Sequence, residues 1–206
     1  MTKEESIALL NREVQGCQKC RLFQGTTNAV PGSGSAEAQI MFVGEAPGFH
    51  EDQQGLPFVG RAGKLLDQLL SQIGLTRGEV FVANVIKHRP PENRDPFPDE
   101  VKACKPYLDR QLEIIDPQVI VSLGRFGLNY FFPDGKISQD HGVPRFLGLR
   151  LIFPVYHPAA ALRNPEVMKS LRVDFMEIPR ILEKRGELLY KPLQREDNSD
   201  QMELFS

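Results

Sequence analysis

Short apolar runs alternate with longer amphipathic stretches along most of this chain. Runs of the length and composition of a buried strand lie at residues 39–43, 80–86, 119–123 and 150–156. Apolar residues at helical spacing occupy residues 2–15, 61–73, 99–115, a short stretch that ends at 132, and 165–186. Strands that alternate with helices in this way form a mainly parallel sheet covered on both faces. The pattern therefore predicts an α/β fold of three layers, α/β/α, around a four-stranded, mainly parallel sheet.

Composition limits the chain to one domain and a tail. Its 206 residues are 41% hydrophobic and 25% charged, which suits one globular core, and we assign residues 1–186 to it. No apolar run approaches the length of a membrane span and no signal-peptide pattern is present, so we expect a soluble, cytoplasmic monomer. Residues 187–206 turn polar and charged until the last few positions, which predicts a flexible tail.

Residues with chemical potential follow three of the predicted strands. Residues 44–52 (GEAPGFHED) follow the first, residues 84–96 (NVIKHRPPENRDP) end the second, and residues 157–163 (HPAAALR) follow the last. Open α/β sheets bind ligands at the carboxyl ends of their strands, where these segments should meet. They offer carboxylates, an amide, a histidine and cations, but no Ser-His-Asp order, phosphate-binding loop or dinucleotide fingerprint.

Together with PFVGRAGKLLD at residues 57–67, these motifs resemble the family-four uracil-DNA glycosylases, the iron–sulfur members of the uracil-DNA glycosylase superfamily. The match covers about residues 4–182. The resemblance implies that superfamily's fold and an enzyme that hydrolyses the N-glycosidic bond of deoxyuridine in single- or double-stranded DNA. Such an enzyme starts base excision repair and works at the nucleoid. Two alternatives stay open from the sequence, namely a relative that binds uracil-DNA without turnover and an iron–sulfur DNA-binding sensor.

Cleavage of this bond requires donors where negative charge develops on the departing uracil, while the sugar becomes cationic. The resemblance assigns His157 as the main electrophile, donating to O2 of uracil. Glu45 and Asp52 are the catalytic candidates for stabilising the cationic sugar or orienting water. The best-known uracil glycosylases carry an aspartate at the position of Ala46, so a strong water-activating base is absent there.

Four further residues are predicted to bind the base: Gly44, Glu51, Phe58 and Asn84. The Asn84 amide both donates and accepts, so it can bind O4 and N3–H of uracil and reject cytosine, which reverses both partners. The resemblance makes Phe58 the ring that stacks on uracil, and Glu51 the residue that crowds C5 and excludes thymine. Backbone N–H groups from Gly44 onward can hold the base or a phosphate.

The bulk charge does not indicate a nucleic-acid binder, because 25 Lys and Arg face 27 Asp and Glu. Basic residues nevertheless gather near the predicted site, and a local patch is enough to engage phosphates. The Leu-Arg pair at 162–163 resembles the family's minor-groove loop, whose apolar wedge fills the gap left by a flipped base. A buried leucine in a helical turn is the alternative. The predicted DNA contacts are Arg61, Lys87, Arg89, Leu162 and Arg163.

Three cysteines do not suggest a disulfide framework. Cys17 and Cys20 form a CxxC without a thioredoxin-like context, which favours a metal or cluster over a redox dithiol. Family-four enzymes hold a 4Fe–4S cluster with four cysteines, and Cys17, Cys20 and Cys104 match three of them. The fourth position, in the family's KCRPP motif, is His88 here, and imidazole can replace thiolate at iron. We expect these four residues to bind the cluster. The alternative is that His88 does not ligate and the cluster is three-iron, labile or absent.

The last residues carry a separate motif. Residues 201–205 (QMELF) resemble the pentapeptide with which bacterial replication and repair proteins bind the sliding clamp. The polar residues before it suit a flexible linker. We therefore expect a clamp partner besides uracil-containing DNA, and no membrane partner. The alternative is an apolar tip that docks on its own domain.

Overall fold

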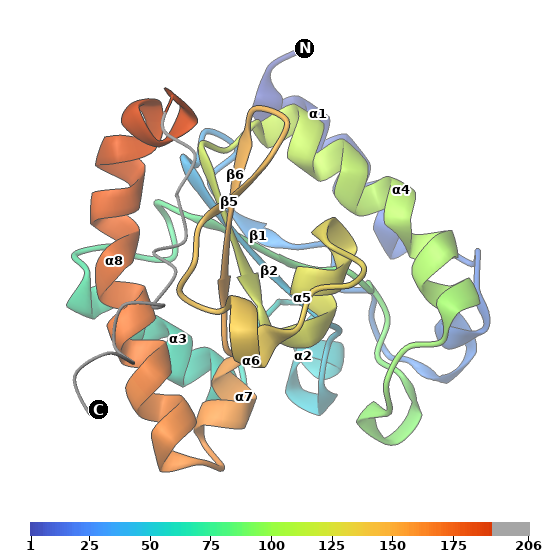
Figure 1. Ribbon diagram of the computed structural model, residues 1–206. Helices are drawn as coiled ribbons and strands as arrows, with labels where there is room; N and C mark the ends of the chain where they lie inside the picture. The colour runs from blue at the N-terminus through green and yellow to red at the C-terminus, as the bar shows by residue number, and fades with distance from the viewer. Residues whose placement is uncertain (191–206) are drawn as a thin grey trace, which may run out of the picture.

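The structure is a computed structural model in which residues 1–190 are described, with side chains to residue 187. Six strands form one mixed sheet in the order β1-β3-β2-β4-β6-β5 (Figure 1). Their bounds are β1 Ser33–Gly34, β2 Ile40–Gly44, β3 Phe81–Asn84, β4 Val119–Leu123, β5 Arg145–Leu147 and β6 Arg150–Val155. The four central strands are parallel, and β1 and β5 pair antiparallel at the two edges. The predicted α/β class is confirmed. The predicted count of four strands is wrong, because edge strands this short show no hydrophobic period.

Within residues 1–190, eight α-helices and two 3₁₀ helices connect and cover the strands. The α-helices are α1 Lys3–Gln15, α2 Phe49–Gln54, α3 Arg61–Gln72, α4 Pro98–Ile115, α5 Gly124–Phe131, α6 Ile137–Asp140, α7 Pro158–Ala161 and α8 Pro165–Tyr190. The 3₁₀ helices are η1 Arg21–Gly25 and η2 Pro91–Asn93. Figure 1 shows α3 and α8 on one side of the sheet and α1 and α4 on the other, which gives the three predicted layers.

The strands supply both halves of the core, because successive side chains point to opposite faces. In β2, Phe42 packs toward α3 and α8, and its ring stacks on Phe175 of α8 with centroids 5.8 Å apart. Its neighbours Met41 and Val43 pack on the other face, in the cluster that contains Leu108 of α4. Continuous apolar runs were therefore the right signal for these strands, since both faces are buried.

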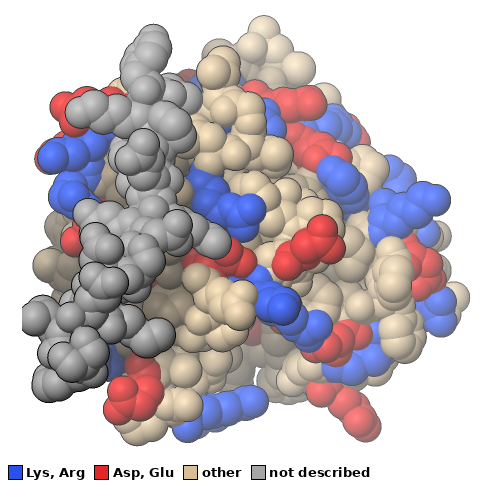
Figure 2. All heavy atoms as spheres, in the orientation of Figure 1, with Lys and Arg blue, Asp and Glu red and all other residues tan. Residues whose placement is uncertain are grey.

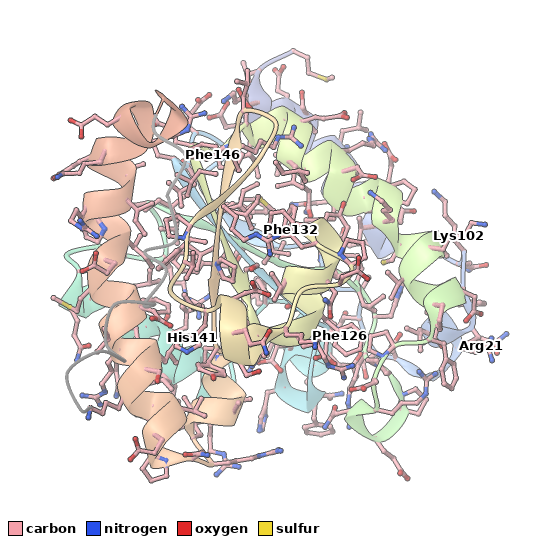
Figure 3. All side chains as sticks on the ribbon, in the orientation of Figure 1. Arg21, Lys102, Phe126, Phe132, His141 and Phe146 are labelled. Atoms are coloured by element: carbon pink, nitrogen blue, oxygen red, sulfur yellow. The ribbon has the colours of Figure 1, made fainter. Side chains whose placement is uncertain are left out.

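Two polar contacts fasten the outer elements. Glu13 of α1 forms a salt bridge with Arg110 of α4, with Arg110 Nη1 2.5 Å from Glu13 Oε2. On the opposite layer, His141 follows α6 and lies toward α8 (Figure 3), where its Nδ1 is 2.9 Å from Oδ2 of Asp174. The His141 ring also contacts Tyr156, with centroids 4.4 Å apart. In the described part of the chain, no helix has the length and apolar character needed to cross a membrane.

The four parallel strands all end on the same side of the sheet, which is called its carboxyl edge from here on. The register pairs Gly44 of β2 with Asn84 of β3, and Val155 of β6 with Leu123 of β4. The three motif segments leave these strand ends, and α2, α3 and α7 lie at the same edge in Figure 1. The predicted meeting of the segments at one edge is confirmed.

Candidate active site

A pocket with a volume of about 420 Å³ opens at this edge. Its walls come from the segments after β2, β3 and β6, from the first turn of α3, and from α7. Six residues that the sequence singled out line it: Glu45, Glu51, Phe58, Asn84, His157 and Arg163. Residues separated by more than 100 positions in the chain therefore share one cavity.

His157 follows β6 and is the N-cap of α7. Its Nδ1 accepts a hydrogen bond from the Ala159 N–H at 3.1 Å. A neutral imidazole whose Nδ1 accepts carries its proton on Nε2. Burial lowers the pKa of His157 to about 4, although the Glu51 carboxylate opposes this shift. The side chain is therefore neutral at neutral pH, with Nε2–H as its free donor.

Asn84 ends β3 and is 1% exposed. Its side-chain Oδ1 is buried and has no hydrogen-bond partner among the described residues. A buried polar atom left without a partner costs about 1–3 kcal/mol. Such an atom in the wall of a pocket indicates a ligand that donates to it. The Asn84 backbone is held from behind, since Lys87 Nζ donates to its carbonyl at 2.8 Å.

Phe58 lies against His157, with ring centroids 5.5 Å apart and 28° between the planes. Its φ of 54° lies in the left-handed region that non-glycine residues rarely adopt. Arg77 Nη2 donates to the Phe58 carbonyl at 2.8 Å and so supports this backbone conformation. A Cβ at Gly44 would lie 2.7 Å from Phe58 Cζ, closer than carbon atoms pack. Gly44 thus leaves the space that Phe58 and the Asn84 side chain occupy.

Glu45 directly follows β2 at the pocket wall. Burial and the nearby Asp95 carboxylate raise the pKa of Glu45 to about 7, while Arg125 opposes the shift. Arg125 in turn donates from Nη2 to Asp95 Oδ2 at 2.5 Å. Glu45 therefore changes charge near neutral pH, which is the property expected of a carboxyl group that takes part in chemistry.

Glu51 of α2 lines the pocket and also joins two of its walls. Its Oε1 accepts from Val59 N–H at 2.9 Å and Gly60 N–H at 2.8 Å, and its Oε2 accepts from Gly48 N–H at 3.1 Å. Three backbone donors fix the carboxylate in one orientation. The sequence did not predict this anchoring, which depends on the six-residue helix α2 inside a segment that reads as a loop.

Two predicted roles are corrected by the structure. Asp52 is 4% exposed and does not line the pocket; its Oδ1 accepts from the backbone of Thr27 at 2.9 Å and of Asn28 at 3.3 Å. It therefore ties α2 to the segment before β1 instead of facing a sugar. Lys87 is completely buried, and its Nζ donates to Gln111 Oε1 at 2.7 Å as well as to Asn84. A side chain in that position cannot reach a phosphate.

The other predicted DNA contacts lie at the surface. Arg61 and Arg163 are exposed, and Leu162 is 46% exposed, so the alternative of a buried leucine is wrong. Arg89 is partly exposed, and its Nε donates to Asn93 Oδ1 at 2.8 Å. Figure 2 shows acidic and basic side chains intermingled over the described residues of the face it presents. The small net charge of the whole chain is therefore compatible with a local group of arginines around the pocket.

Arg94, one of the basic residues that the sequence places near the site, lines the pocket. The buried carboxylate of Glu100 holds it with two hydrogen bonds, at 2.9 Å and 2.7 Å. Arg94 also lies over the Phe97 ring, 3.8 Å from its centroid, and Arg21 lies over the same ring at 5.5 Å. Figure 3 shows Arg21 beside the first turns of α4. The run of charges after Pro90 and Pro91 indicates a cation near the site. Its partner Glu100 lies beyond that run, so the orientation of Arg94 could not be predicted from it.

Comparison with known proteins agrees with this geometry. The model of the uracil DNA glycosylase superfamily matches residues 31–177. The chain belongs to the uracil DNA glycosylase superfamily. It is 50% identical over 184 residues to the Type-4 uracil-DNA glycosylase of Sulfurisphaera tokodaii, covering 84% of each chain. It is 44% identical to the Type-4 enzyme of Archaeoglobus fulgidus and 42% identical to that of Thermotoga maritima. These alignments cover 90% of this chain in both cases, and 98% and 99% of the relatives. The resemblance to the family-four enzymes is therefore confirmed.

The type-4 family implies an iron–sulfur cluster, and this superfamily member brings its three cysteines to one region. Cys17 and Cys20, between α1 and η1, and Cys104 of α4 pack in one small apolar cluster with Tyr107. Burial raises the pKa of Cys104 to about 11 and also raises the pKa of Cys20. Among the described side chains, no three His, Cys, Asp or Glu residues converge closely enough to hold a metal ion. The donor types fit a cluster, but their ligand geometry is not assembled.

His88 is 5% exposed and lies two positions after Ile86, a member of this apolar cluster. Burial lowers the pKa of His88, and the Asp52 carboxylate opposes that shift. The backbone N–H of the preceding Lys87 donates to Cys104 Sγ at 3.2 Å. The backbone around His88 is therefore attached to the cysteine region.

Proposed function

We propose that this protein is a uracil-DNA glycosylase that hydrolyses the N-glycosidic bond of deoxyuridine and leaves an abasic site, the first step of base excision repair. The observation that carries the mechanism is the neutral His157, whose Nδ1 accepts from Ala159 and whose Nε2–H is left for a ligand. An aligned neutral donor can stabilise charge that appears only as the bond breaks.

Asn84 selects the base once the target nucleotide has left the stack. Its unpartnered Oδ1 accepts from N3–H of uracil, and its Nδ2 donates to O4. Cytosine would leave both groups unpaired in a buried position, which supports strong discrimination. Phe58 supplies an apolar ring at the same wall for stacking on the base.

Bond cleavage follows from charge stabilisation on both fragments. His157 donates from Nε2 to O2 as uracil leaves with the bonding electrons. Glu45, when ionised, stabilises the cationic sugar or orients the water that attacks it. As the water oxygen bonds to C1′, its proton passes to the Glu45 carboxylate or to the departing uracil anion. The proton stays on His157 Nε2 throughout, since an imidazole whose pKa is about 4 is a donor in its neutral form.

Glu51 excludes thymine in this proposal, because it faces the pocket with an orientation fixed by three backbone donors. We expect Glu51→Ala to release thymine from a T:G mismatch, while the wild type releases only uracil. If neither protein releases thymine while both still release uracil, Glu51 does not set this specificity.

The proposed contacts with DNA come from residues at the rim of the pocket. Arg61, Arg89 and Arg163 meet phosphates, and exposed Leu162 fills the gap left by the extruded base. Lys87 has no part in these contacts, because its side chain is completely buried.

We also propose that Cys17, Cys20, Cys104 and His88 hold a 4Fe–4S cluster. Clustering of the three thiols in one region supports this assignment, as does the backbone hydrogen bond from Lys87 to Cys104. When bound, such a cluster would join the N-terminal segment to α4. The chemistry at uracil proceeds without it.

The clamp motif at residues 201–205 lies outside the described residues. Its proposed role rests on the sequence pattern alone. A clamp contact would raise the local concentration of the enzyme at newly made DNA.

The deciding experiment is an excision assay. Wild-type protein is incubated with single-stranded and duplex oligonucleotides that carry one uracil, and abasic sites are then cleaved with alkali. Matched oligonucleotides with cytosine or thymine at that position are the controls. We expect strand cleavage only with uracil. Stable binding without cleavage would favour a non-turnover relative, and no uracil-dependent binding or cleavage would contradict the proposal.

A further inference from the structure

An exposed aromatic side chain stands at the mouth of the pocket without a role in the chemistry above. Phe49 is the first residue of α2 and is 53% exposed. Exposing a phenyl ring to water is unfavourable, and single exposed apolar residues usually need no explanation. Phe49 differs in its location, because the preceding residue Gly48 lines the pocket.

A cation accompanies the ring. The Arg89 guanidinium carbon lies over Phe49, 5.2 Å from the ring centroid. Arg89 precedes Pro90, another lining residue, so the pair joins the segments after β2 and β3 at the rim. Asn93 Oδ1 accepts from Arg89 Nε and orients the guanidinium. His50 meets the ring edge-on, with centroids 5.5 Å apart, which restricts the ring further.

An aromatic ring beside an arginine fits an unpaired nucleotide. The ring offers a face for a base, which stacks on aromatic side chains without sequence preference. The guanidinium offers donors for the phosphate of the same nucleotide. A base inside a duplex already stacks on its neighbours and gains little from such a ring.

From this arrangement we infer that Phe49 and Arg89 form a second nucleotide subsite, which holds an unpaired base next to the extruded uridine in single-stranded DNA. The inference rests on the proposed function, and it adds a preference for single strands. The Phe49 ring raises the affinity for single-stranded substrate and contributes little to binding of duplex, whereas Arg89 meets phosphate in both.

The test compares Phe49→Ala with Phe49→Trp. Binding is measured by fluorescence anisotropy with oligonucleotides that contain 2′-fluoro-2′-deoxyuridine, which resists cleavage, as single strands and as duplexes. Loss of one stacked base should weaken single-strand binding about 5- to 100-fold, while Phe49→Trp keeps wild-type affinity. Duplex affinity should change less than about threefold. Leu149→Ala is the matched control, because Leu149 is 76% exposed and precedes β6 at the opposite edge of the sheet.

A second measurement identifies the nucleotide. 2-Aminopurine is placed on either side of the modified uridine, and its fluorescence should be quenched by wild type at one position and restored with Phe49→Ala. Unchanged single-strand affinity in Phe49→Ala, or equal losses on single strands and duplexes, would overturn the inference. Uracil release by the wild type on cleavable oligonucleotides is read separately, so failure of the proposed function would be distinguished from failure of the subsite.

Discussion

The pocket and the cysteine region differ in the side-chain groups that they present. In the pocket, Asn84 and His157 have orientations set by the backbone at strand ends, and each presents a free polar atom. In the cysteine region, among the described side chains, the three thiols lie in one small apolar cluster with Tyr107. Buried cysteine packs as a small hydrophobic residue, and its reactivity or metal binding decides its function. The pocket thus presents free polar atoms to a ligand, whereas the cysteine region is apolar.

Lys87 connects the two regions. Its backbone N–H donates to Cys104 Sγ at 3.2 Å, and its Nζ donates to the Asn84 carbonyl at 2.8 Å. One buried residue therefore contacts a proposed cluster ligand, Cys104, and the proposed base-reading residue, Asn84. Variants that change only one region test whether the two regions contribute independently to activity and stability.

The largest effect is expected in the pocket. His157→Ala and Asn84→Ala should each lower single-turnover uracil excision by about 100- to 1000-fold, the usual loss for one preorganised donor. Both variants should keep the wild-type melting temperature within a few degrees, because each residue serves the ligand more than the core. Near-wild-type excision by His157→Ala would remove its assignment as the electrophile.

The next effect concerns the cysteine region. Wild-type protein purified without oxygen should contain about four iron atoms per chain and show a brown absorption. His88→Ala should lose most of this iron and melt more than about 5 °C lower, since metal binding contributes to folding. His88→Cys, which restores the cysteine of the family motif, should retain the iron.

The outcome for His88 separates the two ligand hypotheses. An iron content and spectrum unchanged in His88→Ala would show that the imidazole is not a ligand. Colourless, iron-free wild-type protein that is fully active and stable would contradict the cluster as a whole.

A smaller effect should appear in the pH dependence. The pKa of Glu45 is raised to about 7, so its carboxylate form is lost as the pH falls through 7. If that form stabilises the sugar cation, the single-turnover rate should fall by up to tenfold per pH unit below about 7. His157, with a pKa of about 4, stays neutral over this range and adds no slope. Glu45→Gln should flatten the profile between pH 5 and 8, and an unchanged slope in that variant would assign the titration to another group.

The sequence predicts which residues lie near the site where they directly follow a strand. It does not predict the direction in which a side chain points. Asn84 and His157 meet because parallel strands share a carboxyl edge, a rule that sequence order already satisfies. Lys87 lies only three residues after Asn84, yet it turns inward to Gln111, a partner on α4 that local pattern cannot reveal. Asp52 was misassigned for a similar reason, because residues 49–54 lack the apolar period that would have indicated α2. Predicting the direction of such side chains requires knowledge of how segments that are distant in the chain pack together.

The smallest effect on catalysis is expected from the tail, which should act independently of both regions. Gln201 offers hydrogen bonds, and Met202, Leu204 and Phe205 offer apolar anchors, as peptides that dock in preformed pockets do. A peptide of residues 194–206 should bind the cognate sliding clamp with a Kd on the order of micromolar, the range expected for a few anchors. Replacing Leu204 and Phe205 by Ala should abolish binding in a calorimetric titration, because a few residues carry most of the energy of such contacts. The same double substitution in the full chain should leave excision from free oligonucleotides unchanged. A tail found packed against residues 1–187 in solution, with no clamp binding, would contradict this prediction, since those anchors would then serve the domain itself.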